Sequence, residues 1–400
     1  MAFIADRLSK IKPSATMSLS SKVAELKRAG KDIIALGAGE PDFDTPDHVK
    51  EAGIRAIKTG KTKYTVVDGI FELKEAIQIK FKRDNGLEYE LDQITVNCGG
   101  KHTIYNTLFA TLNEGDEVLI PAPYWVSYPD MVLLCGGTPK FINAGVELGF
   151  KITPQQLAGA ITAKTKWLMF NSPSNPTGAC YTRADMKALG EVLDLHPHVH
   201  ILVDDIYEQL VYDDFEFCSF ANACPALFDR TLTMNGVAKG YSMTGWRLGY
   251  AGGPKGLIKA ISKIQGQSTS NPSSITQWAS VEALGGPQDF LAPRIQSFQE
   301  RRDLVVKRLN EIEGLSCLKP EGAFYVYVSV KEILGKKTSD GQTLNSDLDV
   351  ATYLLETGGV AAVHGEAFGL SPFIRISYAT SMELLVEAMS RIENSLKSLI

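Results

Sequence analysis

The sequence lacks the features of several protein classes. Its 400 residues include only six cysteines, and no two of them form a Cys-x-x-Cys pair, so we expect neither a disulfide framework nor a zinc site. No apolar run approaches the roughly eighteen residues of a membrane-spanning helix. The N-terminus also lacks an apolar core of signal-peptide length, so a reduced, cytoplasmic protein is expected.

A surplus of positive charge is also missing. The chain has 41 Lys and Arg residues against 46 Asp and Glu, a formal net charge of -5. Without a basic field, neither nucleic acid nor a membrane surface is expected as a partner. The composition is 44% apolar and 22% charged, which is ordinary for a globular protein and excludes disordered, collagen-like and fibrous classes.

From about residue 93 onward, short apolar runs alternate with stretches of helical periodicity. This pattern is typical of repeated βαβ units and predicts an α/β fold with a largely parallel sheet. Strands are expected at 93–98, 117–120, 166–170, 200–203, 231–234 and 247–251, and helices at 103–112, 183–195, 257–264, 272–284 and 290–312. A smaller second part is expected from about 313, with strands at 323–328 and 373–378 and a closing helix at 382–396; the segment before residue 48 is expected to join it.

Polar residues follow several of these strands, at the edge where open α/β sheets place ligands. The loop 171–178 contains two X-Pro bonds, which hold Ser172 and Asn175 outside the helical region. Asp204 and Tyr207 follow the next strand and would bring a carboxylate and a phenol to the same crevice. Taken singly, a turn explains the loop and a helix N-cap explains the aspartate equally well.

Two further strand ends carry a lysine and a glycine pair. Lys239 lies among small residues, which let a flat ligand approach, and a lysine in such a site can lose its proton and become a nucleophile. The alternative is a solvated surface lysine. Gly99 and Gly100 precede Lys101 just before a helix, where free N–H groups can bind a phosphate.

Together these segments resemble the class I aminotransferases, enzymes of fold type I that use pyridoxal 5'-phosphate (PLP), and within them the bacterial aspartate and aspartate-prephenate aminotransferase branch. The resemblance covers nearly the whole chain. The separations from Asn175 to Asp204 (29 residues) and from Asp204 to Lys239 (35 residues) fit the family's order. Further matching segments are Gly37-Ala-Gly-Glu-Pro-Asp-Phe43, Lys63-Tyr64, Pro123-Tyr-Trp125 and Phe373-Ile-Arg375-Ile-Ser-Tyr378.

The resemblance implies a large domain with a mostly parallel seven-stranded sheet and a smaller α+β domain. Residues 1–14 would form an N-terminal arm, 15–47 and 300–400 the small domain, and 48–299 the large PLP-binding domain. The family also implies a homodimer with its active sites at the subunit interface.

The resemblance further implies a role for each site residue. Lys239 would form a Schiff base with PLP and later move a proton. Asp204 would keep the pyridine nitrogen protonated, and Tyr207 and Asn175 would hydrogen-bond the phenolic oxygen. Trp125 would stack on the ring. The phosphate would be bound by Arg247, Gly99, Gly100, Lys101 and Tyr64 of the partner subunit.

Substrate contacts are implied in the same way. Arg375 would bind the α-carboxylate as a bidentate pair, with Gly39, Asn175 and Trp125 completing the pocket. No second arginine is evident for the distal carboxylate, so we nominate Lys101 and Lys12. The alternatives are that Lys101 touches only the phosphate and that Lys12 is a solvated arm residue.

The implied reaction converts L-aspartate and 2-oxoglutarate to oxaloacetate and L-glutamate by a ping-pong path, with prephenate as a further substrate that forms arogenate. Another fold type I enzyme, an aromatic or kynurenine aminotransferase or a β-lyase, remains the alternative. A non-catalytic PLP-fold module is disfavoured by the intact set of Lys239, Asp204 and Arg375. Gly236 departs from the family, since many relatives have a phosphate-binding serine three residues before the lysine.

Overall fold

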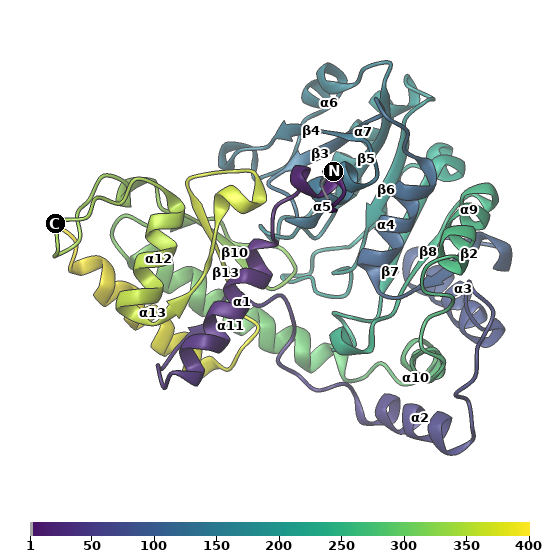
Figure 1. Ribbon diagram of the computed structural model, residues 1–400, viewed down its shortest axis with the longest axis horizontal. Helices are drawn as coiled ribbons and strands as arrows, with labels where there is room; N and C mark the ends of the chain where they lie inside the picture. Colours follow the sequence, from purple (N-terminus) through teal and green to yellow (C-terminus); the bar gives the residue numbers. More distant parts are fainter. Residues whose placement is uncertain (1–2) are drawn as a thin grey trace.

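The computed structural model describes residues 3–400 and contains three β-sheets flanked by helices (Figure 1). The largest sheet has seven strands in the order β2-β8-β7-β6-β5-β3-β4. Strand β8 runs antiparallel to both neighbours, and the other neighbouring pairs are parallel. The predicted α/β class and mostly parallel seven-stranded sheet are thereby confirmed.

The strands of this sheet are mostly apolar, because helices cover both of its faces. Their bounds are β2 Ile94–Asn97, β3 Glu117–Ala122, β4 Thr138–Asn143, β5 Thr165–Asn171, β6 His200–Asp204, β7 Thr231–Gly236 and β8 Gly249–Gly252. The surrounding helices are α2 Asp47–Lys58, α3 Phe71–Asn85, α4 Gly100–Thr111, α5 Ser127–Leu134, α6 Pro154–Ala160, α7 Arg183–Asp194, α8 Phe220–Ala223, α9 Lys255–Gly266 and α10 Ser274–Gly285.

Strand β8 begins two residues later than its sequence pattern predicts. Arg247 has a positive φ of 56° and therefore belongs to the turn before the strand. Gly249 must be small, because a Cβ there would lie 2.4 Å from the backbone nitrogen of Gly100. Since β8 is antiparallel, its first residues lie at the same sheet edge as the carboxyl ends of the other strands, which brings Arg247 to that edge.

A second group of elements forms the C-terminal part, together with α1 (Figure 1). Its four-stranded sheet has the order β12-β13-β10-β9, and β1 pairs with β11 in a two-stranded sheet. This pairing brings the segment before residue 48 to the C-terminal part; the domain boundaries themselves stay a prediction. The bounds are β1 Ile34–Ala35, β9 Ser316–Cys317, β10 Tyr325–Ser329, β11 Val360–Ala361, β12 Val363–His364, β13 Phe373–Ser377, α1 Ala15–Arg28, α11 Leu291–Glu311, α12 Asp347–Gly358 and α13 Met382–Lys397.

Within residues 3–400, none of the helices combines the length and the apolar character that crossing a membrane requires. In the same range, no cluster of three or more His, Cys, Asp or Glu side chains is arranged to hold a metal ion.

A buried ion pair ties α3 to the segment that follows β6. Lys80 is fully buried, pairs with Glu208 and donates to Asn85 Oδ1 over 2.7 Å. Asn85 in turn donates to Glu208 Oε2 over 2.7 Å. The three side chains therefore satisfy one another, and Glu208 fixes the chain directly after Tyr207.

We expect Lys80→Ala to lower the free energy of unfolding by about 3–5 kcal/mol, because it leaves the Glu208 carboxylate buried without its cation. Urea denaturation of the two proteins measures the difference. Lys82→Ala on the same helix is the matched control, since Lys82 pairs with Glu88 at 2.9 Å with both side chains exposed, and it should change stability little. Equal midpoints for Lys80→Ala and the parent protein would contradict the assignment.

Candidate functional site

A cavity of about 400 Å³ opens where the carboxyl ends of the parallel strands meet α1 and the C-terminal part. Strand ends bring polar side chains to it because each chain turn after a parallel strand lies at the same sheet edge. Most of the residues singled out in the sequence line this cavity: Gly39, Gly100, Lys101, Trp125, Asn175, Asp204, Tyr207, Lys239, Arg247 and Arg375.

Lys239 follows β7 and points into the cavity without a carboxylate partner in the described chain. Its Nζ donates to the Gly39 carbonyl oxygen, and its nearest aromatic neighbours are the rings of Tyr207 and Phe324, both 5.9 Å from Nζ. Burial lowers the pKa of Lys239 to about 8, with Arg375 and Arg247 adding to the effect and Glu40 opposing it. A useful fraction of this amine is therefore neutral near physiological pH.

Asp204 ends β6 and presents its carboxylate to the cavity. Tyr128 donates to Oδ2 over 2.6 Å, and the backbone N–H of Ile206 donates to Oδ1 over 3.3 Å. Burial nevertheless raises the pKa of Asp204 to about 6, because these two hydrogen bonds compensate only part of the lost hydration. A cationic ligand group beside this carboxylate would stabilise its charged form and offset the lost hydration.

Arg375 lies on β13 and is almost fully buried. Its Nη1 donates to Asn175 Oδ1 over 2.8 Å and its Nη2 donates to the Gly37 carbonyl oxygen over 2.7 Å. Its Nε is buried and has no hydrogen-bond partner among the described residues. A buried guanidinium with no carboxylate beside it is suited to bind the carboxylate of a ligand.

Arg247, Lys101 and the glycine turn before α4 form a positively charged end of the cavity. A Cβ on Gly99 would lie 2.6 Å from an Arg247 Nη atom, so only glycine lets the guanidinium approach this turn. Burial and the nearby Arg247 lower the pKa of Lys101, whose Nζ lies 4.9 Å from the ring centre of Trp125. Two cations and the N-terminus of α4 together favour a phosphate.

Gly236 lies deeper, beneath this turn. A Cβ there would come within 3.0 Å of the Leu248 carbonyl oxygen of the neighbouring chain segment. A larger residue at this position would therefore need β8 to move, which gives a physical reason for glycine.

Two tyrosines of the cavity escaped the sequence analysis. Tyr128 on α5 is the hydrogen-bond donor to Asp204. Tyr325 on β10 lies 2.8 Å from the Tyr207 hydroxyl oxygen and beneath Arg375, whose guanidinium carbon is 4.4 Å from the ring centre. Neither residue lies at a strand end followed by a loop, so no local signal distinguished them from core aromatics.

Lys12 and Tyr64 lie outside the cavity lining. Lys12 is exposed on the arm before α1, and Tyr64 is 91% exposed in the loop between α2 and α3. Instead, the cavity wall includes Ser14, directly before α1, and Thr16, Met17 and Ser20 on α1. The suggested roles of Lys12 and Tyr64 therefore stay predictions.

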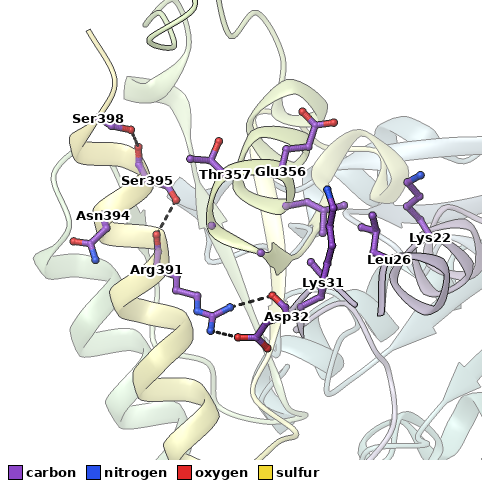
Figure 2. Close-up of a pocket in the computed structure, with 14 residues that line it drawn as sticks. Lys22, Leu26, Lys31, Asp32, Glu356, Thr357, Arg391, Asn394, Ser395 and Ser398 are labelled. Carbon is purple, nitrogen blue, oxygen red and sulfur yellow. Dashed lines mark hydrogen bonds and ion pairs between the residues drawn. The ribbon is translucent and has the colours of Figure 1, made fainter. Parts of the chain in front are cut away.

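A larger cavity of about 670 Å³ lies elsewhere, between α1, α12 and α13 (Figure 2). No candidate residue lines it. Arg391 in its wall is already paired with Asp32 and Glu387, and Ser395 donates to the Arg391 carbonyl oxygen. The guanidinium of this cavity is paired, and Lys22, Lys31 and Glu356 in its wall are exposed, so it lacks the buried lysine, carboxylate and guanidinium that distinguish the smaller cavity.

The chain matches the model of the family "Aminotransferase class I and II" over residues 31–392. It is 61% identical over 393 residues to the aspartate/prephenate aminotransferase of Cereibacter sphaeroides (strain ATCC 17029 / ATH 2.4.9), with 98% of each chain covered. It is 56% identical over 388 residues to an aspartate aminotransferase of Rhizobium meliloti (strain 1021), covering 97% of this chain and 95% of the relative.

Solved structures give the same result. A crystal structure of the aspartate aminotransferase from Rhizobium meliloti superposes with a TM-score of 0.97 at 55% identity and covers all of both chains. The aspartate aminotransferase of Thermus thermophilus with maleate superposes with a TM-score of 0.92 at 42% identity, covering 99% of this chain and 100% of the other.

Proposed function

The chain belongs to the class I and II family of aminotransferases, and from this premise we propose that it transfers the amino group of L-aspartate to 2-oxoglutarate, with prephenate as a second amino acceptor. The products are oxaloacetate with L-glutamate, or arogenate when prephenate accepts. The observation that carries the proposal is one cavity lined by Lys239, Asp204 and Arg375. Within residues 3–400, no ion pair joins the ammonium, carboxylate or guanidinium group of these three residues to an oppositely charged side chain. The names of the similar proteins support aspartate and prephenate.

Enzymes of this family depend on PLP, and the cavity fits that group. Its positive end, formed by Arg247, Lys101 and the Gly99–Gly100 turn, suits the phosphate. The Asp204 carboxylate, whose pKa burial raises to about 6, lacks the cation that a protonated pyridine nitrogen would supply. Lys239 offers an amine at the other side, so the residues present match a flat, anionic aldehyde with a basic ring nitrogen.

When bound, PLP supplies an electron sink that stabilises negative charge on the substrate's α-carbon. Asp204 would hold the ring nitrogen in its protonated form, which maximises that withdrawal of electrons. Tyr207 and Asn175 would donate to the phenolic oxygen, and Trp125 would stack on the ring. Tyr128 packs edge-on against Trp125 at a ring-centre distance of 5.4 Å.

Lys239 performs the proton transfers. Its lowered pKa would let the neutral amine accept a proton from the substrate's α-carbon, and the resulting ammonium would return that proton to the C4′ carbon of the cofactor. Its contact with the Gly39 carbonyl oxygen holds the amine near the substrate side of the cavity.

Arg375 orients the amino acid. Its two Nη groups are held by Asn175 and by the Gly37 carbonyl oxygen, which leaves the Nε edge for the α-carboxylate. Lys101 is also our candidate for the distal carboxylate, since its ammonium group lies over Trp125 in the cavity wall; Arg247 and the Gly99–Gly100 turn would then hold the phosphate without it. Both ends of a dicarboxylic amino acid then meet a cation.

The subunit arrangement is part of the proposal. Tyr64 is 91% exposed although aromatic, and Val66 nearby is 65% exposed. A homodimer that buries this loop against the other subunit would remove that apolar surface from water and bring Tyr64 to the phosphate end of the partner's cavity.

A spectroscopic half-reaction tests the function. The PLP-loaded protein is mixed with L-aspartate without an acceptor; we expect one equivalent of oxaloacetate per active site and a change of the visible absorption band. Addition of 2-oxoglutarate or prephenate should restore the band. Release of pyruvate and ammonia would indicate a β-lyase instead, and a response to kynurenine or phenylalanine but not to aspartate would indicate the other aminotransferases.

The lowered pKa of Lys239 predicts a pH dependence for cofactor capture. Only the neutral amine attacks an aldehyde, so the rate at which the apoprotein captures PLP should rise about tenfold per pH unit below pH 8 and level off above it. Stopped-flow absorbance measures this rate. An ordinary lysine would keep accelerating to about pH 10, and such a profile would contradict the assigned environment.

A further inference from the structure

Tyr325 contacts both Tyr207, our candidate for the phenolic oxygen of the cofactor, and Arg375, our candidate for the substrate's α-carboxylate. It is fully buried on β10, and its hydroxyl oxygen is 2.8 Å from that of Tyr207. Its ring lies beneath Arg375, with the guanidinium carbon 4.4 Å from the ring centre. A Cβ on Gly39 would come within 3.0 Å of the Tyr325 hydroxyl, so this hydroxyl lies directly against the substrate-side wall.

The hydroxyl groups of Tyr207 and Tyr325 have one hydrogen each, so each can donate only one hydrogen bond. Burial raises the pKa of both tyrosines, so each keeps its single hydroxyl hydrogen. If Tyr207 donates that hydrogen into the cavity, its oxygen can only accept from Tyr325. Tyr325 therefore decides whether Tyr207 is oriented to donate toward the cofactor.

Arg375 acts on this donor through the aromatic ring. A guanidinium over the ring face withdraws electron density and makes the Tyr325 hydroxyl a stronger donor, which in turn strengthens donation by Tyr207. A carboxylate bound at Arg375 neutralises the cation and weakens the same chain.

We propose that Tyr325 is a positioning residue that couples carboxylate binding at Arg375 to the hydrogen bond from Tyr207 to the phenolic oxygen of the cofactor. This inference rests on the proposed function. Carboxylate binding would then reach the phenolic oxygen by two routes, directly through the contact of Arg375 with Asn175 and, as the new part, through Tyr325 and Tyr207.

The test is a spectroscopic pH titration of the PLP-loaded protein, with Tyr325→Phe as the variant that keeps the ring and removes only the hydroxyl. Loss of one neutral hydrogen bond should raise the pH at which the visible band changes by about half a unit. Maleate, a dicarboxylate without an amino group, should raise this midpoint in the parent protein. The rise caused by maleate should be smaller in Tyr325→Phe, because the route through Tyr325 and Tyr207 is gone and only the direct contact between Arg375 and Asn175 remains.

Tyr327→Phe is the matched control. Tyr327 lies two residues along the same strand, is also buried, and donates to the carbonyl oxygen of Leu370 over 2.6 Å outside the cavity. This variant should keep both the midpoint and the maleate shift of the parent protein. A role for Tyr325 in packing alone would lower the melting temperature but leave the titration unchanged.

A double-mutant cycle completes the design. In a Tyr207→Phe background, Tyr325→Phe should cause no further change in the midpoint, because its acceptor is already lost. If Tyr325→Phe does not fold, Tyr325→Met removes the hydroxyl with an adaptable apolar side chain and is titrated in its place.

The outcomes separate the two proposals. A parent protein that forms no visible band with PLP would overturn the proposed function. A parent protein that titrates and responds to maleate, with Tyr325→Phe giving the same midpoint and the same shift, would overturn the coupling role alone.

Discussion

Replacement of Lys239 by alanine is expected to lower kcat for aspartate by about 10⁴-fold, since it removes the amine that we propose as both the nucleophile and the base that moves the proton. The cavity should persist, because within the described chain the Lys239 ammonium group makes a single hydrogen bond, to the Gly39 carbonyl oxygen. A coupled assay of oxaloacetate formation measures the loss, and PLP binding measured by absorbance checks that the site is intact.

Lys239→Arg is the informative control for this prediction. It preserves the positive charge, but the guanidinium stays protonated and is neither nucleophile nor base at neutral pH. We therefore expect the same loss of activity. Amino-group cycling within tenfold of the parent rate in Lys239→Ala would show that another group performs the proton transfer.

Asp204→Asn is expected to lower kcat on the order of 10³-fold, comparable to the removal of a preorganised electrostatic contact in other active sites. The amide has nearly the shape of the carboxylate but cannot keep a pyridine nitrogen protonated. Because Tyr128 donates to Oδ2, the amide must turn its oxygen toward Tyr128, which puts its NH₂ group in the place of Oδ1, the acceptor for the Ile206 backbone N–H. Steady-state kinetics with aspartate and with prephenate should show the same factor.

Tyr128→Phe separates the charge of Asp204 from its orientation. It removes the 2.6 Å hydrogen bond and leaves the carboxylate, so kcat should fall by about tenfold, the value of one modest hydrogen bond. If Asp204→Asn were no worse than Tyr128→Phe, the charge of Asp204 would not be the decisive property.

Much of the main sheet is predictable because its strands are short, apolar runs ended by polar or small residues. The expected strand at 200–203 corresponds to β6, and the expected helix at 183–195 corresponds to α7. Strand β4 was not predicted, since Thr138–Asn143 is an edge strand that is mostly exposed and contains Pro139. The helices α2 and α3 were also not predicted, because the alternating pattern begins only after them.

In the candidate site, too, only residues with a local sequence signal could be predicted. Asp204 and Lys239 could be singled out because a polar residue directly after a buried strand is a local signal. Tyr128 and Tyr325 could not, since each acquires its role from a contact made 76 and 118 residues away in the chain. Spacing along the sequence does not encode such contacts; the packing of α5 and β10 creates them.

The hydrogen bonds that define the cavity also determine when it can form during synthesis. Lys239 contacts Gly39 across 200 residues, and Arg375 contacts Gly37 across 338. A nascent chain therefore has no complete ligand-binding site until almost its entire length has emerged and its two ends have met. Any ligand that needs the complete site binds only the fully assembled chain, so it stabilises the native fold as a whole and leaves partly folded forms unprotected.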